Sequence, residues 1–153
     1  MPAHRADFVV FAKDYPEVRL IVEVKSSVVT PRNDDPTIQQ LVQEMWSANC
    51  HYGLIVTPHE TFVLRDDFSK PGPESIRVSD SLPTATLFSR IESPLPNMTN
   101  GRQLEWITRE WLVRLTESYE DALPDDPAVT KALFPEIVGA VSEGRVAGEV
   151  VAR

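Results

Sequence analysis

The stretch Arg19-Leu-Ile-Val-Glu-Val-Lys25 decides the fold, together with the apolar runs on either side of it. Its β-branched residues predict a strand, and Asp7-Phe-Val-Val-Phe11 predicts another strand before it. The turn Lys13-Asp-Tyr-Pro16 between the two runs is short. We therefore expect the two strands to pair as an antiparallel hairpin.

A helix is expected after this hairpin. Asp35 can cap it, and Pro36 suits the first helical position because a missing N–H costs nothing there. The apolar residues that follow have the spacing of one helix face, at Ile38, Leu41, Val42, Met45 and Ala48. The run Gly53–Thr57 then predicts a buried strand, which we expect to pair with Thr61–Leu64. A strand, a helix and a strand in this order predict a crossover between parallel neighbours.

The second half of the chain predicts mainly helices. The expected elements are an edge strand, a short helix, a long helix and one or two short helices, at Glu74–Val78, Thr84–Ile91, Gln103–Leu123 and Ala128–Val151. The long helix has one apolar stripe, formed by Leu104, Ile107, Trp111, Leu115 and Tyr119, and Asn100 with Gln103 resembles a capping arrangement. We therefore expect an α/β core over residues 1–100 and a helical C-terminal extension over residues 101–153 that packs on it.

Composition limits the classes of protein. The chain has 153 residues, of which 42% are hydrophobic and 25% charged, as in an ordinary globular protein. The lone Cys50 excludes an intramolecular disulfide, and no apolar run approaches the ~18 residues of a membrane helix. With no signal peptide recognisable, we expect a cytoplasmic protein without a membrane partner. The net charge of −8 gives no support for sequence-independent binding of nucleic acid, although it does not describe a local groove.

The informative charges lie in the hairpin. Side chains alternate along a strand, so Glu23 and Lys25 share one face of an otherwise apolar segment. A cross-strand salt pair facing solvent is the plain alternative, but the apolar neighbours favour a site, because buried charges need a partner or a metal. If the hairpin brings Asp7 beside Glu23, two carboxylates converge in the way that Mg²⁺ or Mn²⁺ prefers. A simple turn residue is nearly as good an interpretation of Asp7.

The pattern Asp7…Glu23-x-Lys25, followed by a helix, resembles the PD-(D/E)xK restriction-endonuclease-like superfamily. The resemblance covers roughly residues 6–66. It implies an α/β fold with a restriction-endonuclease-like mixed sheet flanked by helices. It also implies that Asp7, Glu23 and the carbonyl of Val24 bind Mg²⁺ (or Mn²⁺), and that Lys25 assists attack on a phosphodiester of DNA.

The helix after the hairpin matches the family in part. Some members carry Gln-x-x-x-Tyr there; Gln40 matches the Gln, and Glu44 stands in place of the Tyr. By resemblance Gln40 positions the scissile phosphate or the water, whereas an exposed helix position is at least as good an interpretation. Gln39 and Gln43 compete for the same role. Trp46, Trp106 and Trp111 have the helical spacing typical of residues in a hydrophobic core. His51 and His59 are expected to be surface loop residues.

The beginning of the chain departs from the family, whose core usually opens with a helix and a strand before the Asp-bearing strand. Six residues precede Asp7. A missing strand would leave a sheet edge that another chain or a C-terminal segment must cover, so a homodimer covering this edge is one expectation. The first functional hypothesis is a Mg²⁺-dependent endo- or exodeoxyribonuclease. The alternatives are a catalytically inactive binding or dimerisation module on the same fold, and a fragment whose site another subunit completes.

Overall fold

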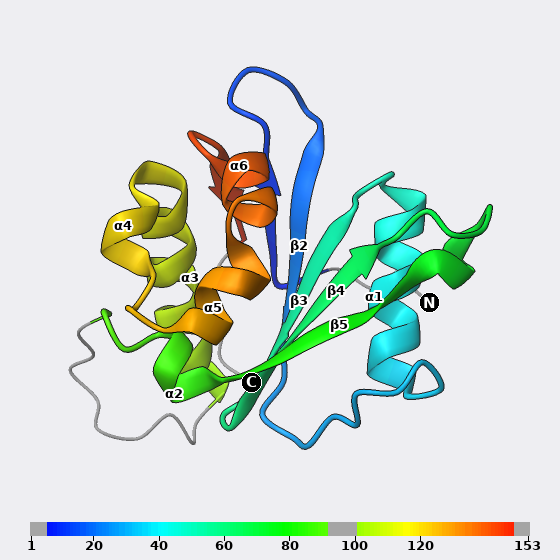
Figure 1. Ribbon diagram of the computed structural model, residues 1–153, viewed down its shortest axis with the longest axis horizontal. Coiled ribbons are helices and arrows are strands. Elements are labelled where there is room, and N and C mark those ends of the chain that lie inside the picture. Colours follow the sequence, from blue (N-terminus) through cyan, green and yellow to red (C-terminus); the bar gives the residue numbers. More distant parts are fainter. Residues whose placement is uncertain (1–5, 92–100, 149–153) are drawn as a thin grey trace.

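The computed structural model describes residues 6–91 and 101–148. Its centre is a mixed sheet with the strand order β5-β4-β3-β2-β1-β6 (Figure 1). The strands are β1 (Phe8–Phe11), β2 (Val18–Val24), β3 (Tyr52–Val56), β4 (Glu60–Asp66), β5 (Ile76–Pro83) and β6 (Arg145–Ala147). β2 and β3 run parallel, and the other neighbouring pairs run antiparallel. The expected hairpin and the expected crossover are therefore confirmed.

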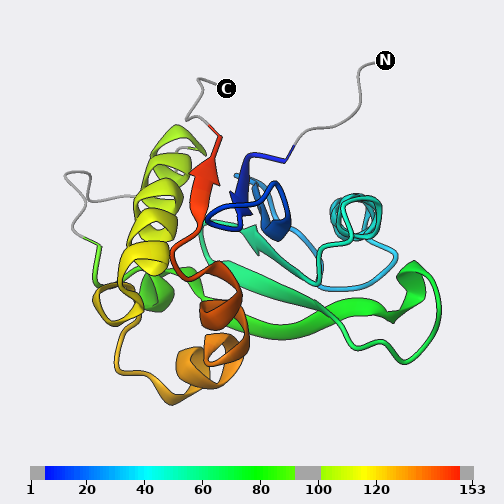
Figure 2. The ribbon, with the colours of Figure 1, turned by 90° about the horizontal axis from the view of Figure 1, so that it is seen from above.

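Helices cover both faces of the sheet, as expected for the α/β class. Those of the described residues are α1 (Pro36–Ser47), α2 (Thr84–Leu87), α3 (Gly101–Glu117), α4 (Tyr119–Ala122), α5 (Pro127–Leu133) and α6 (Glu136–Val141), with a 3-10 turn at Pro73–Ser75. Figure 2 shows α1 on one side of the sheet and α3 to α6 on the other. None of the described helices is long and apolar enough to cross a membrane.

α1 forms where the sequence predicts it. The Asp35 carboxylate accepts hydrogen bonds from the main-chain N–H groups of Thr37 and Ile38, so the side chain caps the helix. The stripe of Ile38, Leu41 and Met45 is buried against the sheet. α1 passes so close to β3 that a Cβ added to Gly53 would lie 2.7 Å from the sulfur of Met45. The tight packing fixes α1 over β3 and beside the hairpin.

The opposite face of the sheet packs on α3, whose stripe is buried from Leu104 to Leu115, with Trp111 fully enclosed. The prediction of one helix over Gln103–Leu123 is wrong at Ser118. Ser118 has an extended backbone (φ −157°, ψ 100°), so the chain bends there and α4 begins at Tyr119, which is 36% exposed. Serine competes for backbone hydrogen bonds and therefore favours helix ends. Asn100, the expected cap, lies outside the described residues.

The C-terminal part contributes a strand that the sequence prediction missed. α5 and α6 lie within the predicted helical stretch, but Arg145–Ala147 forms β6 and pairs antiparallel with β1. Gly144 and Gly148 flank this strand, and an added Cβ at Gly148 would overlap the main-chain oxygen of Asp7. The edge of β1 is thus covered from within the chain. The homodimer stays a prediction, and β6 removes the reason given for it.

Candidate functional site

The hairpin brings Asp7 and Glu23 together. Phe8 pairs with Val22, and Asp7 directly precedes Phe8, so Asp7 lies beside Glu23 where the paired register ends. Glu23 points to the same face as Ile21, which packs in the cluster under α1. The two carboxyl side chains are 8% and 2% exposed. Glu23 is therefore buried on the α1 side of the sheet, and Asp7 is buried next to it, directly before β1.

A main-chain hydrogen bond joins Val24 of β2 to the Asp7 side chain. The Val24 N–H donates this hydrogen bond of 2.7 Å to Oδ2 of Asp7, which holds the Asp7 carboxylate against β2. The carbonyl of a strand residue points to the same side as its N–H, so the Val24 carbonyl also faces the Asp7 side of β2. The three residues expected to bind the metal therefore meet where β1 begins and β2 ends.

Burial dominates the electrostatics of Glu23. Desolvation raises its pKa from 4.5 to about 7, against the opposing effects of the Lys25 ammonium and of a hydrogen bond with the Glu44 carboxyl. Two carboxyl groups joined by a hydrogen bond hold a proton between them. With a pKa of about 7, protonated and ionised forms of Glu23 coexist at neutral pH.

Lys25 and Gln40 are the remaining predicted site residues near the Glu23–Glu44 pair. Lys25 is half-buried directly after β2, and its main-chain N–H donates a 2.9 Å hydrogen bond to the carbonyl of Val56. Gln40 is half-buried one helical turn before Glu44, and residues four apart lie on one side of a helix. Gln39 and Gln43 are exposed and line a separate hollow beside Glu74. Of the three competing glutamines, Gln40 is the one that shares the side of α1 that meets Glu23.

Glu44 is the residue that sequence reasoning missed as a member of the site. It was interpreted only as a departure from a Tyr, yet its carboxyl contacts Glu23. The signal was available in the helix period: Gln40 and Glu44 flank the buried stripe of Leu41 and Met45 on the same side.

Two other expectations concern aromatic side chains, and Cys50 can be assigned beside them. Trp111 is core, as expected, whereas Trp46 and Trp106 are 48% and 37% exposed. His51 and His59 are exposed, in agreement with their interpretation as surface residues. Cys50 is buried and its pKa is raised to about 11 by desolvation, so it is an unreactive core thiol.

The oxygen-only donor set suits a hard divalent cation. Within residues 6–91 and 101–148, no group of three or more His, Cys, Asp or Glu side chains is arranged to hold a metal ion. The set implied by the resemblance needs two carboxylates and a main-chain carbonyl, and these are the groups that converge beside β1. Because a carboxylate ligand must be deprotonated, binding of a cation by Glu23 would release a proton at pH values below its raised pKa.

The chain was compared with family models, with curated proteins and with solved structures, and none of the three comparisons found a match.

Proposed function

We propose that the protein hydrolyses phosphodiester bonds of DNA with Mg²⁺ or Mn²⁺, on a restriction-endonuclease-like fold. One observation carries the proposal. The buried carboxyl group of Asp7, directly before β1, bonds the Val24 N–H next to the buried Glu23, and the ammonium of Lys25 is close enough to lower the pKa of Glu23. Burying two carboxyl groups in a small sheet is costly, and carboxyl groups with raised pKa values cluster at functional sites.

The arrangement of the chain around the hairpin supports the same fold. The sequence of β1, β2, α1 and β3 gives a hairpin, a crossover helix and a parallel strand. The family's leading helix and strand precede the Asp-bearing strand. Here β6 lies beside β1 and α3 packs next to it, so a helix and a strand from the C-terminal side are proposed to take that place.

Each side chain has a role in this proposal. Asp7, Glu23 and the Val24 carbonyl hold the cation, which when bound lowers the pKa of a water and neutralises phosphate charge. Lys25 stabilises the negative charge that develops on the phosphate. Gln40 orients the phosphate or the attacking water. Glu44 is a positioning residue, because its hydrogen bond fixes the Glu23 carboxyl.

Binding of Mn²⁺ tests the metal site directly. Mn²⁺ should raise the thermal unfolding midpoint of the wild-type protein, because a ligand that binds only the folded state stabilises it. Asp7→Asn should abolish the rise, whereas Asp125→Asn, on an exposed turn, should keep it. An equal rise in the Asp7→Asn variant would remove the metal site from the proposal.

Cleavage tests the reaction. With Mg²⁺, the wild-type protein should cleave DNA, and Lys25→Met should lower kcat by about 100-fold or more, because Lys25 stabilises charge in the transition state. Lys70→Met, at an exposed lysine outside the site, is the matched control and should cleave as wild type does. Cleavage by Lys25→Met at the wild-type rate would contradict the proposal.

The second candidate is a catalytically inactive module that binds or assembles. It is favoured by Glu44, which stands where a Tyr completes the family motif and which engages Glu23 directly. Under this alternative, neither the rise with Mn²⁺ nor cleavage is expected.

A further inference from the structure

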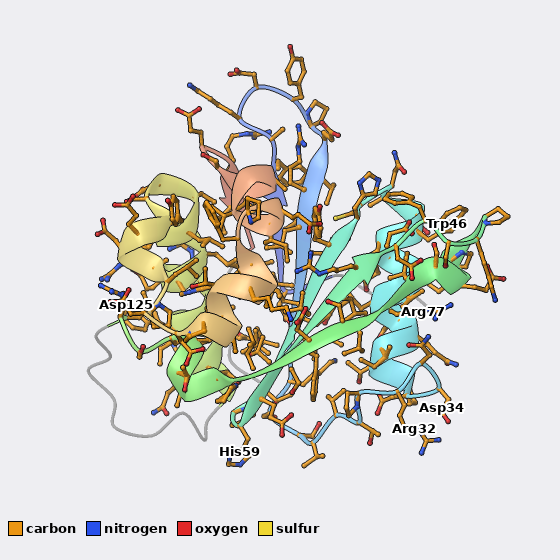
Figure 3. The ribbon with its side chains drawn as sticks, in the orientation of Figure 1. Arg32, Asp34, Trp46, His59, Arg77 and Asp125 are labelled. Atoms are coloured by element: carbon orange, nitrogen blue, oxygen red, sulfur yellow. The ribbon has the colours of Figure 1, made fainter. Side chains whose placement is uncertain are left out.

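A second feature lies at the end of the sheet, beside the candidate site. Residues 26–31, which follow β2, and the turn of residues 57–60 between β3 and β4 enclose a cavity of about 260 Å³. It opens at the carboxyl ends of the parallel strands β2 and β3, which is where ligands bind in open α/β sheets. Figure 3 places His59 on this end of the sheet and Trp46 toward the opposite end.

The walls of the cavity are mainly apolar. Five of the residues that line it have apolar side chains: Val28, Val29, Pro31, Pro58 and Phe62. Its polar lining comes from Ser27, Thr57, His59 and Glu60. Among the described residues, no Lys or Arg side chain lines it. A phosphate would need such a cation, whereas a neutral planar group with polar edges matches these walls.

The cavity is on the same face of the sheet as the Glu23 carboxyl group. Glu23 is opposite Ile55, and Ile55 is opposite Phe62, so the three side chains form one row across β2, β3 and β4. Since neighbouring strands are ~4.8 Å apart, Phe62 lies about 10 Å from Glu23. Lys25 follows Glu23 toward the same end, where its N–H bonds the Val56 carbonyl next to Thr57. A base bound in the cavity would thus lie at about the length of one nucleotide from a phosphate bound by Lys25.

One wall of the cavity is held rigidly. Thr57 Oγ1 donates to the Glu60 carbonyl at 2.6 Å and accepts from the Glu60 N–H at 3.1 Å. Below the turn, Thr84 Oγ1 donates to the Thr57 carbonyl at 2.7 Å and lies 2.9 Å from Thr61 Oγ1. Thr61 and Thr84 are fully buried. The turn that carries His59 is therefore fixed before any ligand binds, which lowers the entropic cost of binding.

The opposite wall offers an apolar contact. Val28 is 91% exposed at the rim, beside the buried Val29. The loop behind it is tied down by a 3.0 Å hydrogen bond from the Thr30 N–H to Oδ2 of Asp35, the residue that caps α1. An isolated exposed valine needs no explanation, but one held at the mouth of an apolar cavity can cover the face of a bound ring.

We propose that this cavity binds one unpaired nucleobase of the DNA strand whose phosphate lies at Lys25, and that the substrate is accordingly DNA with unpaired nucleotides. The proposal rests on the proposed nuclease function and deepens it. A base inside an intact duplex is stacked and cannot enter a pocket, whereas a single-stranded or frayed base can. Apolar walls contact the faces of the base, and Ser27 and His59 contact its polar edge.

Binding of a mononucleotide tests the pocket apart from the reaction. With Mg²⁺, deoxyadenosine 5′-monophosphate should shift the amide NMR signals of Ser27, Val28 and His59, and deoxyribose 5-phosphate, which lacks the base, should leave them in place. Val28→Asp should weaken binding of the mononucleotide about five-fold or more, as expected for loss of a contact with a base. Phe68→Asp adds the same charge at another exposed apolar residue and should leave the affinity unchanged. His59→Ala should weaken binding without altering the rim.

Cleavage kinetics distinguish the proposed base pocket from the proposed nuclease activity. On single-stranded DNA, Val28→Asp should raise KM while kcat stays near the wild-type value, and blunt duplex should be a poor substrate for both proteins. Cleavage that depends on Lys25 but shows no base-dependent shifts and no preference for unpaired DNA would overturn the pocket and leave the nuclease. Base-dependent shifts without cleavage of any DNA would overturn the nuclease and leave the pocket.

Discussion

Side chains of the β1–β2 hairpin that face α3 to α6 are apolar, whereas those that face α1 include the buried carboxyl group of Glu23, beside the buried Asp7. Phe8, Val10 and Val22 pack into the cluster that surrounds Trp111. Glu23, one position along β2 from Val22, is buried on the other side, and Asp7 is buried next to it, directly before β1. The alternation of a strand thus lets one hairpin supply core on one face and a candidate site on the other. Stability is expected to reside in the first face and chemistry in the second.

The largest expected effect is a loss of stability on the apolar face that packs on α3. Trp111→Ala should lower the free energy of unfolding by about 3–5 kcal/mol, because the side chain is fully buried and its removal leaves a cavity. Trp106 lies on the same helix and is 37% exposed, so Trp106→Ala should cost much less. Urea unfolding measured by circular dichroism compares the two. Equal losses would mean that α3 does not pack on the sheet through Trp111.

The next effect concerns the second face and depends on pH. Because the folded pKa of Glu23 is raised from 4.5 to about 7, its contribution to stability is fully present below pH 4.5 and is lost as pH rises through about 7. A pKa change of this size corresponds to on the order of 3 kcal/mol. In the absence of metal, Glu23→Gln should therefore be more stable than wild type at pH 9 and close to it at pH 4.

Urea unfolding of both proteins across this pH range, with EDTA present, measures the difference. Glu60→Gln, at an exposed glutamate, is the control and should follow the wild-type profile. If the free energy of unfolding of the wild type rose from pH 5 to pH 9 relative to that of Glu23→Gln, burial would not oppose ionisation of the Glu23 carboxyl group. The two faces of the hairpin would then not differ as proposed.

A third effect concerns the strand that joins the hairpin from the C-terminal side. Gly148 has φ of +124°, and an added Cβ would overlap the main-chain oxygen of Asp7. Gly148→Ala should therefore cost about 1–3 kcal/mol and also weaken the rise of the unfolding midpoint with Mn²⁺, because Asp7 must shift. Gly139→Ala is the control: nothing lies within 4 Å of its added Cβ, and alanine favours α6. A full response to Mn²⁺ in Gly148→Ala would separate β6 from the site.

Local patterns predicted the hairpin, α1 and β3, because the strands there are β-branched runs and the helix has both a cap and a stripe. β6 escaped prediction, since three residues between two glycines carry no period of their own, and the strand exists only through its pairing with β1. The site divides in the same way. The charges of Glu23 and Lys25 in an apolar run were visible, whereas the contact of Glu44 with Glu23 depends on how α1 docks on the sheet.

The smallest effect compares two helix caps on opposite faces. Asp35 caps α1 and Asp126 caps α5, and each carboxylate accepts hydrogen bonds from two main-chain N–H groups of its own helix; Asp35 accepts a third from Thr30. Asp35→Ala and Asp126→Ala should each cost about 1 kcal/mol, measured by urea unfolding. Only Asp35 orients the helix that carries Gln40 and Glu44. Asp35→Ala should therefore also reduce the rise of the unfolding midpoint with Mn²⁺, and Asp126→Ala should not. Equal reductions in both variants would mean that the Mn²⁺ response follows global stability rather than the position of α1.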